Sequence, residues 1–411
     1  MNSERTSNRL FWTLFFVYIA NIVGKTSFSA TTAALVNDSI LTKTEAGIIG
    51  GGFWFLYAVG QFGGGFFTKK MSPYLMMLIS VLSATVSNLL LPLAGGFVPM
   101  FLVWGMNGVL QFGLWPAILE LVSTEILPKH RPKAIKRLAL CFCVGSAINY
   151  ILTAGVLAIT DWKYIFIICG IVSGVSLLGV VYSWTRLSPT LKTEGMKNVY
   201  DANRKEKLTW PIVRDSSLIV FCIMMIIKSV VDTGIKNWMP TIMIETYEAT
   251  PSFASLLSVV LLVTNLVGIT IGSYIYERTK SDELKTLRIL YVIMMPMMVL
   301  LVGFRNMNIL ITTVIMSAIT LLIYGSGQVL QMNYPGRFQR WGMAAAIGGV
   351  INGFASLGSM IATYSGGFIA DHFGWDAMIG IWNGLVILFV ILNVMSAKKW
   401  KQFRKEINRV R

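Results

Sequence analysis

Five ionisable side chains lie inside long apolar runs of this sequence, where charged groups are rare. They are Lys25, Glu120, Lys228, Asp232 and Lys236. A charge at the centre of a lipid bilayer costs roughly 2.5–3.5 kcal/mol on insertion scales unless it is paired or faces water. Such residues therefore indicate a site that holds a charged solute or carries a proton. That is binding chemistry and not the making of covalent bonds.

Three of these residues, Lys228, Asp232 and Lys236, are spaced four apart and so share one face of a helix. One interpretation is a lining for a polar solute. The other is an ion pair within the helix, with Lys236 reaching toward the outer end. We predict that Asp232 and Lys25 line a binding site, and we keep both interpretations for Lys228, Lys236 and Glu120. Asp232 and Glu120 are the candidates for carrying a coupling proton.

Aromatic and amide side chains within the same runs complete the predicted substrate-binding site. They are Tyr57, Gln61, Gln111, Trp115, Asn149, Tyr324 and Asn352. Each has a structural alternative, because tyrosine and tryptophan also form the interfacial belts of membrane proteins and amides also join neighbouring helices.

Catalytic and metal-binding chemistry is poorly represented. The four cysteines, Cys141, Cys143, Cys169 and Cys222, fall in apolar runs, as small buried hydrophobic residues do. The chain has two histidines, and no nucleotide-binding loop or nucleophile–base pair is evident. We predict that the protein is not an enzyme and has no catalytic residue, metal site or cofactor.

The elements that must position these residues are membrane-spanning helices. Of the 411 residues, 55% are hydrophobic and 13% are charged, against roughly 25% charged in a soluble domain. The mean hydropathy is +0.66. This composition excludes a soluble enzyme, a secreted scaffold and a disordered chain. The apolar runs are continuous and do not alternate, so they predict helices and not a transmembrane barrel.

Twelve runs approach the roughly 20 apolar residues that span a bilayer, which predicts an all-α membrane protein with twelve transmembrane helices. The expected spans are Leu10–Leu35, Ala46–Phe67, Tyr74–Leu91, Pro99–Leu121, Leu138–Ile159, Tyr164–Trp184, Ser217–Ile244, Phe253–Tyr276, Ile289–Phe304, Ile309–Met332, Gly342–Ile369 and Ala377–Met395.

The basic residues predict the orientation of these spans. Of 35 lysines and arginines, 32 lie outside the expected helices, and 29 of those fall on one side if the N-terminus is cytoplasmic. This asymmetry follows the positive-inside rule. We therefore predict a multi-pass protein of the plasma membrane with both termini in the cytoplasm. The net charge of +16 then reflects topology, and no nucleic-acid partner is expected.

The chain also divides into two similar halves. Gly145–Asn149 in span five matches Gly348–Asn352 in span eleven, and the tripeptide Val-Leu-Gln ends at Gln111 in span four and at Gln331 in span ten. We predict a six-helix half at 1–187, a cytoplasmic linker at 188–215, a second six-helix half at 216–397 and a basic cytoplasmic tail at 398–411. Parallel halves of this kind form the major facilitator fold, whose pseudo-two-fold axis would place Asn149 and Asn352 on opposite sides of a central cavity.

Over nearly its whole length the sequence resembles the organophosphate:phosphate antiporter branch of the major facilitator superfamily. The most specific stretch is Ala370-Asp-His-Phe-Gly-Trp-Asp376, after span eleven. Gln111-Phe-Gly-Leu-Trp-Pro116, Leu322-Ile-Tyr-Gly325 and Gly234-Ile-Lys-Asn-Trp-Met-Pro-Thr241 also look like that branch.

This resemblance implies two arginines facing each other at the floor of the pocket. Here Lys25 stands where the arginine of span one is expected, and Asp232 takes the place of the arginine of span seven. Gln61 replaces a pocket lysine, a histidine of span five is absent, and Glu120 replaces an arginine. Two arginines suit a phosphate dianion, whereas a lysine and an aspartate can neutralise each other directly or through water.

We therefore expect a secondary active transporter that moves a small polar metabolite, anionic or zwitterionic, by alternating access across the plasma membrane. The expected partners are this substrate, the lipid bilayer and a coupling proton or counter-anion, and the expected state is a monomer. One alternative is a proton-coupled exporter of amphipathic compounds. Another is a transporter-like ligand sensor, although the sequence shows no appended domain of the kind that such receptors carry.

Overall fold

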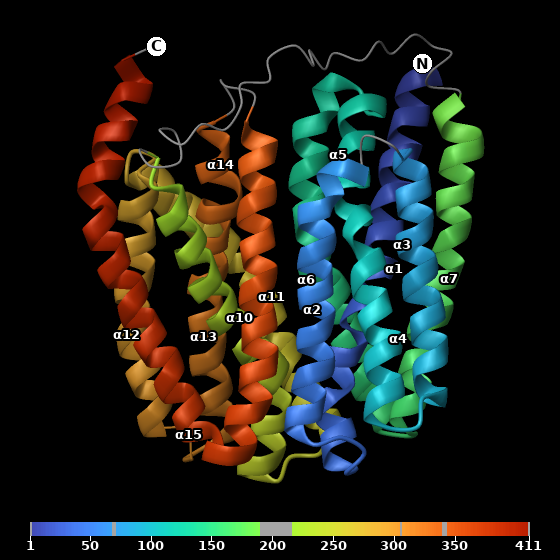
Figure 1. Cartoon of the computed structure of the whole chain (residues 1–411), viewed down its shortest axis with the longest axis vertical. Coiled ribbons are helices and arrows are strands. Elements are labelled where there is room, and N and C mark those ends of the chain that lie inside the picture. The colour runs from blue at the N-terminus through green and yellow to red at the C-terminus, as the bar shows by residue number, and fades with distance from the viewer. Residues whose placement is uncertain (1, 68–70, 190–215, 305, 339–342, 410–411) are drawn as a thin grey trace.

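The computed structural model describes residues 2–67, 71–189, 216–304, 306–338 and 343–409. All regular structure within these ranges is helical, and it forms two bundles that stand side by side (Figure 1). The predicted linker is described only at 188–189, so its residues 190–215 lie outside the described ranges.

The N-terminal half holds seven long helical segments. They are α1 (Asn2–Asn37), α2 (Lys43–Phe67), α3 (Pro73–Leu90), α4 (Phe97–Leu110), α5 (Leu114–Glu125), α6 (Arg131–Leu157) and α7 (Trp162–Tyr182). The C-terminal half holds α10 (Leu218–Tyr247), α11 (Pro251–Arg278), α12 (Glu283–Phe304), α13 (Ile309–Gln328), α14 (Tyr334–Gly336) and α15 (Ala344–Arg409).

Ten helical stretches of the described residues are long and apolar enough to cross a membrane. The last of them contains two of the expected spans, because Gly374 interrupts α15 with φ 77° and ψ 175°, a conformation that is essentially confined to glycine. The expected span Ala46–Phe67 lies within α2. All twelve expected spans thus overlap helical structure over most of their length, and Gly342 lies outside the described residues.

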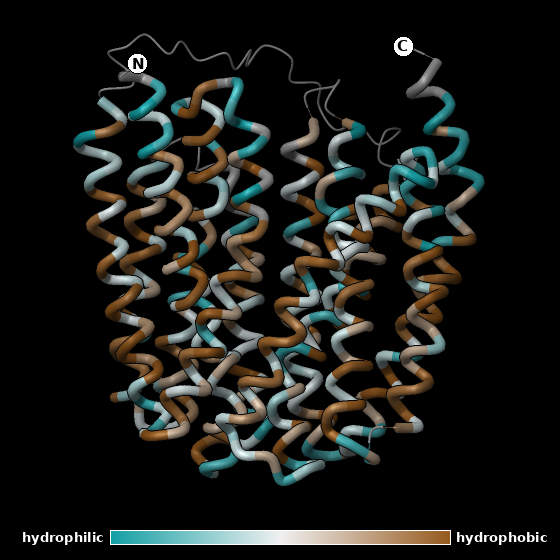
Figure 2. The backbone as a smooth tube through the Cα atoms, turned by 180° about the vertical axis from the view of Figure 1, so that it is seen from behind, coloured by the Kyte–Doolittle hydropathy of each residue, from teal (hydrophilic) through white to brown (hydrophobic). Residues whose placement is uncertain are grey.

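Hydrophobic residues cover the middle of the helices and polar residues gather toward the two ends (Figure 2). The N- and C-termini lie at the same end of the molecule (Figure 1). Several helices begin where the sequence supplies a cap. At α3 and α11, the Ser72 and Thr250 hydroxyls each accept a hydrogen bond from a backbone N–H of the first turn, and a proline follows.

Two prolines shape the helices next to the predicted site. Pro116 has no N–H and its ring crowds the carbonyl four residues earlier, and a 3₁₀ turn at Gln111–Gly113 separates α4 from α5 just before it. Pro240 lies inside α10 and leaves the Lys236 carbonyl without its helical donor. The Tyr150 hydroxyl of the other half donates to that carbonyl at 3.4 Å.

The two halves touch at the end of the bundle that lies opposite the termini. Gly47 of α2 and Gly367 of α15 let the two backbones meet, since a Cβ on Gly367 would stand 2.1 Å from the Lys43 carbonyl oxygen. The Lys43 ammonium pairs with Glu245 at 2.9 Å and lies 3.7 Å from Asp371. On the other flank, Ser252 of α11 donates to the Ala154 carbonyl of α6 at 2.7 Å.

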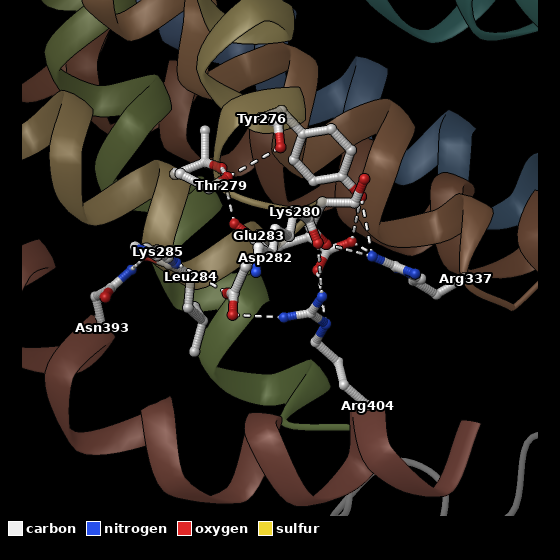
Figure 3. A network of polar contacts seen from close by, with 12 residues as sticks. Tyr276, Thr279, Lys280, Asp282, Glu283, Leu284, Lys285, Arg337, Asn393 and Arg404 are labelled. Carbon is white, nitrogen blue, oxygen red and sulfur yellow. Dashed lines mark hydrogen bonds and ion pairs between the residues drawn. The ribbon is translucent and has the colours of Figure 1, made fainter. Parts of the chain in front are cut away.

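At the end of the molecule where the termini lie, an ionic network joins helices of the C-terminal half (Figure 3). The fully buried Glu283 carboxylate accepts hydrogen bonds from the Tyr276 hydroxyl and from Arg337 Nε, both at 2.7 Å. Arg404, near the end of α15, pairs with Asp282. Burial works against the charge of Arg337, but the hydrogen bond and the charge of Glu283 outweigh it and raise the pKa of the guanidinium above its ordinary value.

Candidate functional site

A buried ionic triad lies in the middle of α10. Lys228 Nζ donates to Asp232 Oδ2 at 2.7 Å, and Lys236 Nζ lies 2.8 Å from Asp232 Oδ1. The second contact lacks hydrogen-bond geometry, so Oδ1 receives no hydrogen bond. Lys228 and Asp232 are 7% and 4% exposed. The spacing of four residues therefore does produce an intrahelical cluster, but Lys236 turns inward to Asp232 and does not extend toward the helix end.

Tyr324 of α13 and Phe142 of α6 cover this triad. The Lys236 ammonium donates to the Tyr324 hydroxyl at 3.3 Å, and it lies 4.8 Å from the centre of the Tyr324 ring and 5.7 Å from that of Phe142. The Lys228 ammonium lies 5.3 Å from the Tyr324 ring centre. The aromatic faces thus share in stabilising two ammonium groups that have only one carboxylate between them.

Lys25 of α1 sits in a different environment, against three rings of α2. Its ammonium lies 3.6 Å from the ring centre of Tyr57, 5.0 Å from that of Trp54 and 5.7 Å from that of Phe53. Within the described part of the chain, no carboxylate pairs with it. The direct pairing of Lys25 with Asp232 that the sequence suggested is therefore not found, because Asp232 is already held by two lysines on its own helix.

The three rings around Lys25, those of Phe53, Trp54 and Tyr57, form an aromatic cage. A chain of hydrogen bonds connects the C-terminal half of the molecule to this cage. Asn352 of α15 donates to Gln61 Oε1 at 3.0 Å, and Gln61 Nε2 in turn donates to the Tyr57 hydroxyl at 2.8 Å. Three of the predicted residues thus meet across the interface between the halves. A substitution at any of them would therefore alter the hydrogen bonding of Tyr57, the residue whose ring lies closest to the Lys25 ammonium.

Lys25 lines a small cavity together with Tyr57, Gln111 and Trp115, all of which belong to the predicted set. The cavity volume is about 20 Å³, which is room for roughly one water molecule. Gln111 is 2% exposed and donates to the Ser80 carbonyl and to Asn107, so it also joins α3 to α4. Trp115 stacks on Tyr18 with a centroid distance of 5.3 Å.

Five lining residues of the cavity were missed by the sequence analysis, and besides the aliphatic Ile22 and Leu114 they include three polar or aromatic side chains. Tyr18 and Asn21 precede Lys25 by seven and four residues, so they lie on the same face of α1. Phe142 lines the cavity and also contacts Lys236, so it lies between the two charged clusters. The helical spacing from Lys25 could have identified Tyr18 and Asn21, whereas nothing in the sequence singles out Phe142 from other buried phenylalanines.

Two predicted residues lie elsewhere. Asn149 is fully buried within the N-terminal half, where it donates to the Thr26 hydroxyl at 3.0 Å and accepts from the Cys169 thiol. It therefore joins helices, and it does not line the cavity at Lys25. Glu120 is exposed on α5 and does not line the cavity.

The site as a whole carries three ammonium groups and one carboxylate, a formal charge of +2. No group of three or more metal-ligating side chains occurs among the residues that the structure describes. Buried positive charge, aromatic faces and amides suit the binding of a small organic anion.

Comparison with known sequences matches the chain to one family. The model of the Major Facilitator Superfamily matches residues 14–338. A probable hexose phosphate transport protein of Chlamydia muridarum is 26% identical over 204 residues, which cover 49% of this chain and 44% of that protein. The D-galactonate transporter of Escherichia coli O6:H1 is 20% identical over 199 residues, covering 48% and 46%.

The hexuronate transporter of Bacillus subtilis is 19% identical over 404 residues, which cover 93% of this chain and 92% of that one. The matches to the Chlamydia muridarum and Escherichia coli proteins thus span less than half of those proteins. Among solved structures, a bacterial homologue of the lysosomal transporter Spinster, inward-facing and occupied, aligns with a TM-score of 0.72 at 14% identity over 96% of both chains. A peptide transporter aligns with a TM-score of 0.73 at 11% identity, over 96% and 95%.

Proposed function

This chain belongs to the Major Facilitator Superfamily, and from that premise we propose that it is a secondary active transporter of a small organic anion derived from a sugar. It works by alternating access in the plasma membrane and is not an enzyme. Its substrate site lies between the halves, at Lys25 on α1 and the Lys228–Asp232–Lys236 triad on α10.

The observation that carries this proposal is the half-buried Lys25 side chain, which lines a cavity and has aromatic rings but no described carboxylate beside its ammonium. Holding a charge largely away from water without a counter-ion is costly, and an anionic solute would supply the missing partner. The relatives support the same class, since those named above are described as carriers of hexose phosphate, D-galactonate and hexuronate.

The contacts between the halves support alternating access. Several of them lie at the end opposite the termini, where α2 meets α15 and Lys43 pairs with Glu245, and the Asn352–Gln61 hydrogen bond lies farther along α2. Together with the bond from Tyr150 to the Lys236 carbonyl, they close the site from that side. We propose that substrate binding and release require these contacts to separate and re-form, while each half moves largely as a rigid body.

The test is flux into liposomes that contain the purified full-length protein. We expect saturable uptake of radiolabelled D-galactonate, D-glucuronate or glucose 6-phosphate, and no uptake of neutral D-galactose. Lys25→Gln should lower kcat/KM by at least about 30-fold, because losing one member of a buried charge pair costs 2–5 kcal/mol. Lys163→Gln, which alters an exposed lysine at the start of α7, should transport as the unaltered protein does.

Three outcomes would contradict the proposal. Uptake of cationic or amphipathic compounds without uptake of any anion would favour the exporter. Saturable binding of an anion without flux would favour a ligand sensor. Equal uptake by Lys25→Gln and by the unaltered protein would remove Lys25 from the site. Repeating the flux with imposed proton or phosphate gradients identifies the coupled ion.

A further inference from the structure

Asn21 is a buried amide with an unused donor, one helical turn from Lys25 on α1. Its side chain is 1% exposed and its Nδ2 has no hydrogen-bond partner. It precedes Lys25 by one helical turn and lines the same cavity. Nearly all buried polar groups in proteins are satisfied, so an unpartnered donor on a residue that lines this cavity together with an ammonium that lacks a carboxylate indicates a group that binds there.

The number of free cations limits what that group can be. Lys228 and Lys236 already share the Asp232 carboxylate, at 2.7 and 2.8 Å. Within the described residues, this leaves Lys25 as the cation of the site that no carboxylate neutralises. A phosphate dianion is best held by two cations or by the bidentate fork of an arginine. One ammonium and one amide donor instead match a single carboxylate, with one oxygen to each donor.

The rest of the cavity wall suits the carbon skeleton of such a molecule. The stacked pair Tyr18 and Trp115, together with Phe142, presents aromatic faces next to the two donors. The cavity holds about one water molecule in this closed arrangement, so the body of the substrate enters only when the halves separate. The donors themselves are both on α1, and they stay together during that movement.

Resting on the proposed transport function, we infer that the substrate is a sugar monocarboxylate whose carboxylate is held in the N-terminal half by Lys25 and the side-chain amide of Asn21. Asp232 acts as a resident carboxylate in the C-terminal half, and it lowers the positive charge there. Asn21 is then a specificity-determining residue for carboxylate over phosphate.

The first measurement needs no variant. Ligand-induced thermal shifts and uptake in proteoliposomes are compared for D-galactonate, D-glucuronate and glucose 6-phosphate. We expect both sugar acids to bind and to be transported, and glucose 6-phosphate to be at least about tenfold weaker in each assay. Glucose 6-phosphate that binds and is transported as well as the sugar acids would overturn the inference while leaving anion transport intact.

The second measurement alters the amide. Asn21→Leu removes the donor at similar volume and should raise KM for D-galactonate about tenfold or more, the loss expected for one hydrogen bond to a charged group. Asn21→Asp adds a carboxylate beside Lys25 and should abolish uptake. Asn21→Ser keeps a donor in a smaller side chain, so its KM for D-galactonate should lie between those of the unaltered protein and Asn21→Leu. It replaces Asn21→Leu as the test if the leucine variant does not fold.

The matched control is Asn265→Leu. Asn265 is also fully buried with an unpartnered amide, but it lies on α11 and does not line the cavity. Its variant should keep the KM of the unaltered protein. An unchanged KM in both Asn21→Asp and Asn21→Leu would exclude Asn21 from the site without touching the proposed function. Absence of any anion flux in the unaltered protein would overturn both.

Discussion

At the scale of single residues, the site has three ammonium groups and only one carboxylate. Asp232 is the partner of two lysines on its own helix, and Lys25 is left with aromatic rings. Cation–π contacts are worth about 2 kcal/mol when desolvated, which is less than the cost of burying a charge. The aromatic cage therefore tolerates the Lys25 ammonium without satisfying it, and a solute anion would be drawn to it.

The triad makes a prediction about stability. Asp232→Asn leaves two buried ammonium groups without their counter-charge and should destabilise the protein by about 3–5 kcal/mol. A second change, Lys228→Met, removes one of those ammonium groups and should recover part of the loss. Lys25→Met should recover nothing, because Lys25 does not pair with Asp232. Thermal unfolding of the four proteins in detergent measures this, and equal rescue by both lysine variants would contradict the triad.

At the scale of elements, the close approach of α2 and α15 holds the halves together at the end opposite the termini. The ion pair of Lys43 with Glu245 lies in the same place, but its side chains are 17% and 35% exposed. Pairs of this kind contribute only about 0–1 kcal/mol. Backbone contact at Gly47 and Gly367, where no side chain intervenes, is the stronger constraint.

We therefore expect Gly367→Ala to push the halves apart at this end. Its Cβ would stand 2.1 Å from a backbone oxygen, so the helices must shift, and such overpacking typically costs about 1–3 kcal/mol. Spin labels at Asp38→Cys and Glu248→Cys, exposed positions on the two halves, should report a longer distance. Gly303→Ala, where a Cβ would meet nothing within 4 Å, is the control. An unchanged distance in Gly367→Ala would show that the contact does not gate the site.

At the scale of the whole molecule, two bundles carry both chain ends on the same side (Figure 1). This is the arrangement that an even number of spans requires. The ionic network of Glu283, Arg337 and Arg404 stiffens the C-terminal bundle at that side (Figure 3). Each half can therefore move as a unit, while the interface between the halves breaks and re-forms.

The distribution of basic residues predicts which side faces the cytoplasm. Because 29 of the 32 basic residues outside the expected helices fall on the side of the termini, an engineered protease site at either terminus should be cut only after cells are permeabilised. The same site placed between Asn37 and Lys43 should be cut in intact cells. Cleavage at a terminus in intact cells would refute the orientation.

The sequence by itself determined the helical class, the positions of the spans and the residues of interest on α1 and α10. Hydrophobic length and helical spacing are local properties, and a span of about 20 apolar residues has few alternatives in a bilayer. The residue spacing also brought Lys228, Asp232 and Lys236 together, since four residues make about one turn of the helix that contains all three.

Only the tertiary structure decided which partners each polar side chain takes. It joined Gln61 to Asn352, which lie 291 residues apart, and gave Asn149 to Thr26, 123 residues away. In the folded protein Asp232 pairs with lysines of its own helix, and the Lys25 ammonium contacts the rings of α2. Asn21 lines the cavity next to them. Such choices depend on contacts of about 3 Å between packed helices. Apolar periodicity tells which face of a helix is buried but does not tell which neighbour it meets.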